Sequence, residues 1–162
     1  MNETPSISTI LYATDLGDQA KPVFKHALAL AKQYGAKIVM IHVVEPMNEA
    51  TAFFINSYTA ENMSEEVQKE TMKKILTKMK ERLKKFYADE CGGQEAGSPV
   101  KDLLVVSGRP SEEILRVAEE DKADMIIMGK STRRVRGIRV MGSTARRVSR
   151  MSDVPVLIVP NY

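Results

Sequence analysis

The sequence has one cysteine, two histidines and no tryptophan, and these scarcities exclude several classes of protein. Because Cys91 stands alone, no disulfide can form within the chain, and no Cys/His set has the spacing of a zinc site. We interpret Cys91 as an incidental thiol at the end of a helix. The chain does not open with a basic start and a long apolar stretch, and no run approaches the ~18 apolar residues of a membrane helix. We therefore expect no membrane partner and a reducing, cytoplasmic location.

The sequence also has little excess of either charge, since its 24 Lys and Arg are nearly balanced by 21 Asp and Glu. A net charge of +3 is too small to indicate a nucleic-acid partner by itself. The length of 162 residues suits one domain, 1–162, and 43% hydrophobic residues are enough for a buried core. The composition thus predicts a single globular domain.

Short apolar runs alternate with stretches of helical periodicity along the chain. Strands are predicted at 7–13, 38–44, 100–106, 124–128 and 154–159. Helices are predicted at 18–34, from Glu65 to Tyr87, around 112–118 and at 142–150. Such alternation implies right-handed crossovers and an open five-stranded parallel sheet with helices on both faces, the α/β class of Rossmann-like folds.

Two segments have no period. Residues 47–63 are too apolar for a purely solvated loop, because they contain Phe53, Phe54, Ile55 and Tyr58, and they can cover a site or contact a partner. Residues 89–99 contain three glycines and a proline, which is typical of a flexible connection.

The loop after the fourth strand is the strongest candidate for a ligand site. Ligands of open parallel sheets bind beyond the carboxyl ends of the strands, so only loops that follow strands qualify. Gly129 and Gly142 bracket this loop, where a backbone must turn sharply or approach a ligand closely. The free amides of the following helix, with the hydroxyls of Ser143 and Thr144, would form an anion site that suits phosphate. We expect the main-chain amides beside both glycines to converge on one pocket with Asp15 and to cradle a polyphosphate.

Basic residues are concentrated in and after the same loop. Between Lys130 and Arg150 there is no acid, and guanidinium groups pair well with phosphate oxygens. The cluster as a whole favours anion binding, although any one arginine can belong to an ordinary solvated helix face. The eight basic residues are Lys130, Arg133, Arg134, Arg136, Arg139, Arg146, Arg147 and Arg150.

Motifs for catalysis are absent from the sequence. Gly129-Lys130-Ser131 imitates the end of a P-loop, but Asp124 stands where that loop needs its first glycine, and no G-x-G-x-x-G follows the first strand. We interpret His42 as a packed residue of its strand and His26 as a surface residue. Without a nucleophile with its base, a carboxylate pair or a metal cluster, the sequence offers no assembled catalytic machinery, and we expect any hydrolysis to be slow.

The glycine spacing resembles that of the universal stress protein family. Members that bind ATP have Gly, two residues, Gly, nine residues, then Gly followed by Ser or Thr; here Gly129, Thr132, Gly142 and Ser143 stand at those positions, with one glycine replaced. Other segments resemble the family along nearly the whole chain: ILYATDLG, IHVVEP, SGRPSEEIL, GSTARRV and PVLIVP. The resemblance implies the adenine nucleotide alpha hydrolase-like arrangement, with strand order 3-2-1-4-5 in chain numbering.

The resemblance also implies a site for ATP, with Mg²⁺ or Mn²⁺ held by the phosphates, in a protein with a regulatory or stress-response role. The nucleoside would contact the turn after the first strand, and Val43 would lie behind the adenine. The terminal phosphates would be held at the start of the last helix. The residues implied are Ala13, Thr14, Asp15, Val43, Met128, Gly129, Lys130, Thr132, Arg133, Gly142, Ser143 and Thr144.

Several alternatives remain open at this stage. Asp15 can be a turn or helix-capping residue, and Thr132 would cost on the order of 1–2 kcal/mol if that position needs a positive φ. A stress protein without nucleotide could act through its dimer surface and 53–58, whereas a weak ATPase would depend on Lys130. Nucleic-acid binding is disfavoured because no aromatic residue interleaves with the arginines.

The predicted strand 154–159 is apolar throughout and closes the chain. An exposed edge strand of this kind invites pairing, so we expect a homodimer formed through 154–159, as the family resemblance also implies. A further protein partner is expected, but the sequence does not identify it.

Overall fold

The computed structural model describes residues 3–46, 65–91, 97–131 and 134–161. Its centre is a parallel five-stranded sheet with the order β3-β2-β1-β4-β7, which confirms the predicted class and order once β7 is counted as the fifth strand. The strands are β1 (Thr9–Ala13), β2 (Lys37–Val44), β3 (Val100–Ser107), β4 (Met125–Gly129) and β7 (Val156–Val159).

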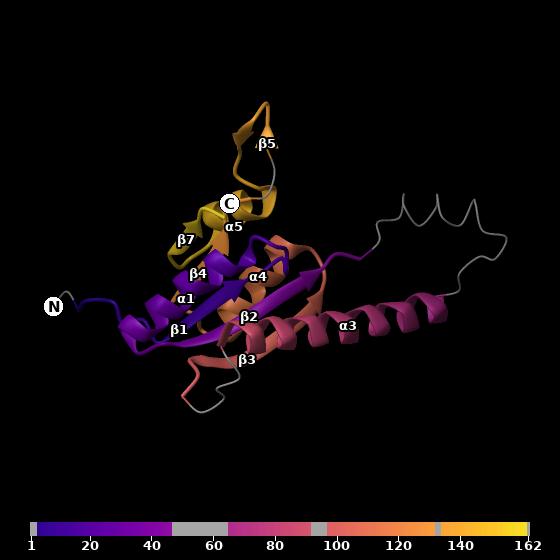
Figure 1. Cartoon of the computed structure of the whole chain (residues 1–162), viewed down its shortest axis with the longest axis horizontal. Helices are drawn as coiled ribbons and strands as arrows, with labels where there is room; N and C mark the ends of the chain where they lie inside the picture. Colours follow the sequence, from indigo (N-terminus) through magenta and orange to yellow (C-terminus); the bar gives the residue numbers. More distant parts are fainter. Residues whose placement is uncertain (1–2, 47–64, 92–96, 132–133, 162) are drawn as a thin grey trace.

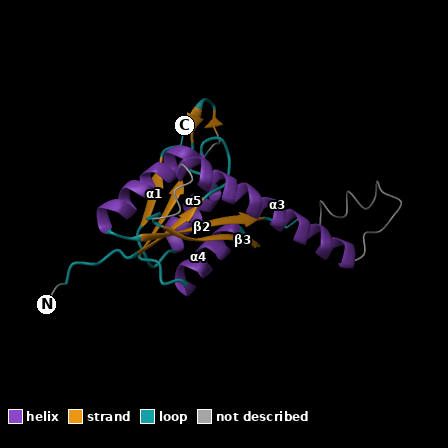
Figure 2. Cartoon of the chain, turned by 60° about the horizontal axis from the view of Figure 1, so that its bottom comes forward, coloured by secondary structure: helices purple, strands orange, loops and turns teal. Residues whose placement is uncertain are grey.

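Helices cover both faces of the sheet, as Figures 1 and 2 show. The helices are α1 (Ala20–Tyr34), α3 (Glu65–Cys91), α4 (Pro110–Glu120) and α5 (Ser143–Met151). Helices α1 and α3 contribute buried residues to one apolar cluster, whereas α4 and α5 contribute to the other. The fold therefore has three layers, with the sheet in the middle.

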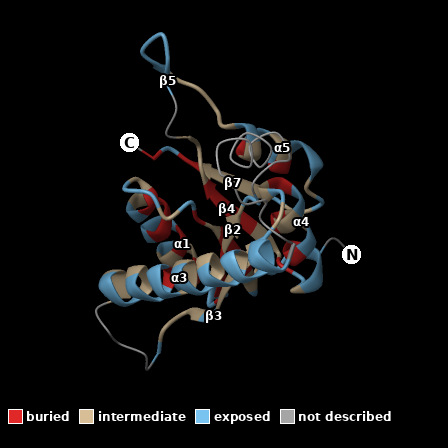
Figure 3. Cartoon of the chain, turned by 90° about the vertical axis from the view of Figure 1, so that its right-hand side faces the viewer, coloured by how far each residue is buried: buried red, intermediate tan, exposed pale blue. Residues whose placement is uncertain are grey.

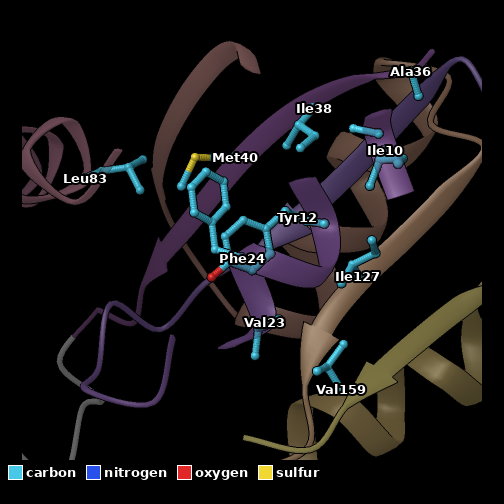
Figure 4. Packing of buried hydrophobic residues seen from close by; sticks show 12 residues of the cluster. Ile10, Tyr12, Val23, Phe24, Ala36, Ile38, Met40, Leu83, Ile127 and Val159 are labelled. Atoms are coloured by element: carbon cyan, nitrogen blue, oxygen red, sulfur yellow. The ribbon is translucent and has the colours of Figure 1, made fainter. Parts of the chain in front are cut away.

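The central strands bury both of their faces, which explains their nearly continuous apolar sequence. In β1, Ile10 and Tyr12 belong to the cluster beneath α1 and α3, and Leu11 between them belongs to the cluster beneath α4 and α5. Figure 4 shows Tyr12 against Phe24 of α1, and their ring centroids lie 5.5 Å apart. Leu83 brings α3 into the same cluster and is fully buried.

Helix ends follow the local sequence signals, with small shifts from the predicted bounds. Gly35 ends α1 with φ 65°, a left-handed conformation. Its amide donates hydrogen bonds to the carbonyls of Ala31 and Lys32. The third predicted helix, expected around 112–118, begins earlier, because Pro110 is the first residue of α4. Its missing amide hydrogen is harmless there, because the first turn has no intrahelical acceptor for it.

Helix α3 runs well beyond the sheet at its N-terminal end (Figure 1). It ends at Cys91, four residues past the predicted end, which places the thiol at a helix end as expected. Burial raises the pKa of the Cys91 thiol, and the charge of Glu90 raises it further, so the thiol stays protonated at neutral pH. None of the described helices is long and apolar enough to cross a membrane.

The basic loop, residues 129–141, contains a hairpin that the sequence analysis did not predict. Strands β5 (Arg134–Val135) and β6 (Ile138–Arg139) pair antiparallel around Arg136 and Gly137. Both turn residues have positive φ, 51° and 80°, as a tight two-residue hairpin turn requires. Arg-Gly is a weaker signal for this turn than Asn-Gly or Asp-Gly, which is why the sequence did not predict the hairpin.

Asp124 connects the starts of β4 and β1, and replacing it with alanine is expected to destabilise the sheet. Its Oδ2 accepts the amides of Ser8 and Thr9 at 2.8 and 3.0 Å. Removing a charged acceptor shared by two amides should lower the free energy of unfolding by about 1–3 kcal/mol in urea titrations. Glu119→Ala, which removes an exposed acid of α4, should change it by less than about 0.5 kcal/mol. Equal effects of the two substitutions would contradict this role of Asp124.

Candidate functional site

A cavity of about 300 Å³ opens at the carboxyl ends of β1 and β4. These two strands are neighbours in the sheet, and the chain leaves β1 toward β2 on one side and β4 toward β7 on the other. Such a reversal is where open α/β sheets bind ligands. The volume is at the lower end of the range for small-molecule pockets.

Ten of the twelve site residues predicted from the sequence line this cavity. The ten are Ala13, Thr14, Asp15, Val43, Met128, Gly129, Lys130, Gly142, Ser143 and Thr144. Thr132 and Arg133 lie outside the described residues, as does the whole of 47–63. The expected juxtaposition of the turn after β1 with the loop after β4 is therefore present.

The turn after β1 is held rigidly by its own side chains. Thr14 is buried; its amide donates to the Ile41 carbonyl at 2.9 Å, and its Oγ1 accepts the Leu16 amide at 3.0 Å. Asp15 Oδ1 accepts the Gly17 amide at 2.9 Å, which is the turn role considered for this aspartate. Because one carboxylate oxygen holds the turn, the other oxygen of the exposed Asp15 can face a ligand.

His42 and Tyr12 line the cavity, and both have structural contacts. His42 Nδ1 lies 2.8 Å from the Thr14 carbonyl, and because a carbonyl only accepts, Nδ1 carries the proton. Tyr12 donates its hydroxyl to the Ala20 carbonyl at 3.2 Å. Burial raises the pKa of the Tyr12 phenol well above its usual value, so the hydroxyl stays neutral. These contacts favour a structural role for both side chains.

One side of the cavity is apolar. Ile41 and Val43 of β2, Met128 of β4 and Ile114 of α4 all line it. Ile41, Met128 and Ile114 are buried and belong to the cluster beneath α4 and α5. This wall suits a flat apolar group, and the polar groups at the ends of β1 and β4 lie beside it.

Asn161 is a site residue that the sequence analysis missed. Its side chain is buried and lines the cavity, and its Oδ1 accepts the Ser131 amide at 2.9 Å. Its main-chain carbonyl accepts a hydrogen bond from Arg139 Nη1. A Cβ added to Gly129 would lie 2.7 Å from Asn161 Nδ2, which is closer than packed atoms approach. Gly129 therefore makes room for the C-terminal asparagine.

The amides after Gly129 do not face the cavity as free donors, which corrects our expectation. We expected the main-chain amides around both bracketing glycines to cradle an anion. The Lys130 amide donates to the Val159 carbonyl at 2.8 Å, and the Ser131 amide is bonded to Asn161. The Gly142 amide donates to the Lys130 carbonyl at 2.9 Å. Within the described part of the loop and helix, the first turn of α5 remains as the source of amides for an anion.

The start of α5 has the features of an anion site. Gly142 is its N-cap residue, in an extended conformation and without a capping side chain, and the first turn contains no acid. The first amides of a helix have no partner within the helix, and their positive end attracts anions. Ser143 and Thr144, the first two residues of α5, both line the cavity. A Cβ on Gly142 would make only ordinary contacts, so packing within the chain does not require glycine there.

At the described positions of 130–150, the arginines do not line the cavity, in contrast to our expectation that the basic cluster as a whole binds the anion. Lys130 is the one described member of the cluster that lines the cavity. Those at other described positions, Arg134, Arg136, Arg139, Arg146, Arg147 and Arg150, lie elsewhere. The described residues also contain no group of three or more His, Cys, Asp or Glu side chains that could hold a metal ion.

The sequence of the chain matches a known family along nearly its whole length. The model of the universal stress protein family covers residues 6–160. The chain belongs to the universal stress protein family.

Two relatives illustrate how close the match is. The Thermus aquaticus protein described as "Universal stress protein in QAH/OAS sulfhydrylase 3'region" is 33% identical over 151 residues, which are 93% of this chain and 97% of that protein. Universal stress protein MJ0577 of Methanocaldococcus jannaschii is 27% identical over 154 residues, 93% of each chain.

Solved structures share the same fold. The structure of MJ0577 matches with a TM-score of 0.72 and 26% identity, covering 98% of this chain and 99% of that one. A universal stress protein solved in complex with cAMP matches with a TM-score of 0.58 and 20% identity, covering 96% and 98%. The sheet order and layers described above are therefore those of a universal stress protein domain.

Proposed function

We propose that this universal stress protein binds an adenine nucleotide in the cavity between β1 and β4. The proposal rests on one observation: the apolar wall of the cavity and the start of α5, which has no capping side chain, line the same cavity. An adenine ring needs the first feature and phosphates need the second. The cAMP complex of a protein with the same fold supports this choice of ligand.

The adenine packs against Val43 and Met128, and Asp15 accepts a hydrogen bond from the ribose hydroxyls. The phosphates lie at the start of α5, where the amides and hydroxyls of Ser143 and Thr144 donate to them and Lys130 contributes a positive charge. ATP is the nucleotide we favour. A Mg²⁺ or Mn²⁺ ion would be held by the phosphates and water, since the described residues offer it no carboxylate cluster.

The role of such a site is regulatory. A bound nucleotide contacts the loop after β4 at Lys130 and the helix after it at Gly142, so it biases the conformation of the segment between them. A partner that binds this segment would sense the nucleotide. The cavity presents no nucleophile paired with a base among its described residues, which favours binding over rapid hydrolysis.

Analysis of the small molecules released from the purified, denatured protein tests the proposal. We expect adenine compounds in the extract, or binding of ATP with magnesium at micromolar concentrations in calorimetry. Absence of both would overturn the proposal and favour a stress protein that works through protein contacts alone. ATP turnover that is lost in Lys130→Ala would instead indicate an ATPase.

We propose further that two copies pair through β7. Ile126 donates its amide to the Pro155 carbonyl at 2.9 Å, and Lys130 to the Val159 carbonyl at 2.8 Å. In a parallel strand, every second residue forms hydrogen bonds with the same neighbouring strand. Since Pro155 and Val159 bond β4, the backbone amide and carbonyl of Ile158 point the other way, toward the open edge of the sheet.

Ile158→Pro is expected to convert the dimer to a monomer. Proline removes the outward amide hydrogen of the edge and leaves the hydrogen bonds to β4 in place. Analytical ultracentrifugation would measure the change, and circular dichroism would establish that the monomer is folded. A wild-type protein that sediments as a monomer, or a folded Ile158→Pro variant that stays dimeric, would contradict pairing through β7.

A further inference from the structure

The β5–β6 hairpin presents two aliphatic side chains on one of its faces. Its register pairs Val135 with Ile138 and Arg134 with Arg139. Since side chains alternate along a strand, the aliphatic pair lies on one face and the arginine pair on the other. Arg136, in the turn, adds a third positive charge at the tip.

This aliphatic pair is exposed to an unusual degree. Ile138 is 70% exposed and Val135 49%, which makes them two of the five exposed large hydrophobic residues in the described part of the chain. Figure 3 shows the hairpin in the colour of exposed residues, standing away from the body of the protein. Neither side chain belongs to either core cluster, so the fold gains no burial from them. A two-residue ladder far from the core is suited to contact with something outside the chain.

The surroundings of the pair are strongly basic. Residues 134–139, which form the hairpin, contain three arginines and no acid. Arg134 and Arg136 form no ion pair with a described residue; the ion pairs within the described ranges involve Lys21, Arg109 and Arg116. The hairpin does not line the cavity between β1 and β4, so the proposed nucleotide does not account for these charges.

We propose that the hairpin tip docks on an anionic lipid surface, with Val135 and Ile138 entering the boundary between head groups and acyl chains. Anionic head groups attract arginines that lie beside the surface, and aliphatic side chains gain by leaving water. A bilayer needs no shape-matched pocket, which suits a tip this small. Two aliphatic side chains fall far short of the ~800 Å² per partner of a stable protein interface.

The same residues argue against a nucleic-acid partner. Exposed valine and isoleucine gain nothing from a phosphate backbone, and no aromatic side chain stands on the hairpin to stack on bases. The expectation of no membrane partner was based on the lack of a spanning helix. Peripheral docking by a hairpin requires none.

Co-sedimentation with vesicles tests the proposal. The full-length protein should sediment with vesicles of phosphatidylcholine mixed with phosphatidylglycerol, but not with phosphatidylcholine alone, and added salt should weaken the binding. Arg134→Gln with Arg136→Gln should reduce partition about thirtyfold, because each arginine near an anionic surface contributes about a factor of five. Val135→Ser with Ile138→Ser should reduce it about tenfold at unchanged charge.

Matched controls separate docking from general electrostatics. Lys25→Gln with Lys32→Gln removes the same charge from the exposed face of α1, and Val67→Ser removes an exposed aliphatic side chain from α3. Both should leave partition within twofold. Equal losses in the lysine control, or no loss in the Val135/Ile138 variant, would overturn the proposal. So would conversion of a dimer to a monomer by the Val135/Ile138 variant, which would identify the tip as an interface between copies. ATP binding is measured in parallel and should stay unchanged in all four variants.

Discussion

Replacing Gly142 with aspartate is expected to stabilise the protein and to weaken nucleotide binding strongly. Gly142 has φ −63° and ψ 155°, the extended conformation that an N-cap aspartate adopts, and a Cβ there meets no atom closer than 3.4 Å. The carboxylate would accept amides of the first turn of α5 and face the positive end of the helix. Capping, charge and a less flexible unfolded chain together should contribute about 1 kcal/mol.

The same carboxylate would occupy the place of the phosphates. It removes the free amides as donors and repels the anion, so ATP affinity should fall about a hundredfold, which calorimetry can measure. The melting temperature should rise by about 2–4 °C at the same time. Gly142→Asn is the matched control, since it caps the helix without a charge and should weaken ATP binding less. A Gly142→Asp protein that binds ATP like the wild type would contradict phosphate binding at α5.

The sheet could be predicted from the sequence because its signals are local. Strands buried on both faces must be apolar at nearly every position, as in Ile38–Ile41, and helices between them show a period that matches their one buried face. The position of the cavity followed from the same pattern, because loops after neighbouring parallel strands share one edge of the sheet. The strand order rested on the family resemblance.

The parts that sequence analysis missed depend on contacts between distant residues. No local pattern signals that Asn161 bonds Ser131, 30 residues earlier, or that Val159 accepts the Lys130 amide. For this reason the glycine motif wrongly predicted that the amides after Gly129 donate to phosphate. In the structure these amides already donate to Val159 and Asn161. The hairpin was missed because a tight turn was closed by Arg136 at φ 51°, a conformation that arginine rarely adopts.

The role found for Gly129 leads to the second large effect. Gly129→Ala should lower the free energy of unfolding by about 1–3 kcal/mol in urea titrations, because its methyl group would lie 2.7 Å from Asn161 Nδ2 and 2.9 Å from Cγ. The asparagine side chain would have to leave its buried position, and the hydrogen bond that its Oδ1 accepts from the Ser131 amide would be lost. One attachment of the loop after β4 to the C-terminal segment would then be gone.

A double-mutant cycle separates this steric role from any other function of the glycine. In an Asn161→Ala background the obstacle is gone, so Gly129→Ala should cost at least about 1 kcal/mol less than it does in the wild type. Asp124→Ala provides the control: it lies at the other end of β4, and its effect should add to that of Gly129→Ala within about 0.5 kcal/mol. If Gly129→Ala were equally destabilising with and without Asn161, the glycine would be required by the strand itself. If the cycle shows the coupling, Gly129 is needed to leave space for the Asn161 side chain. The phosphates would then be bound by the start of α5.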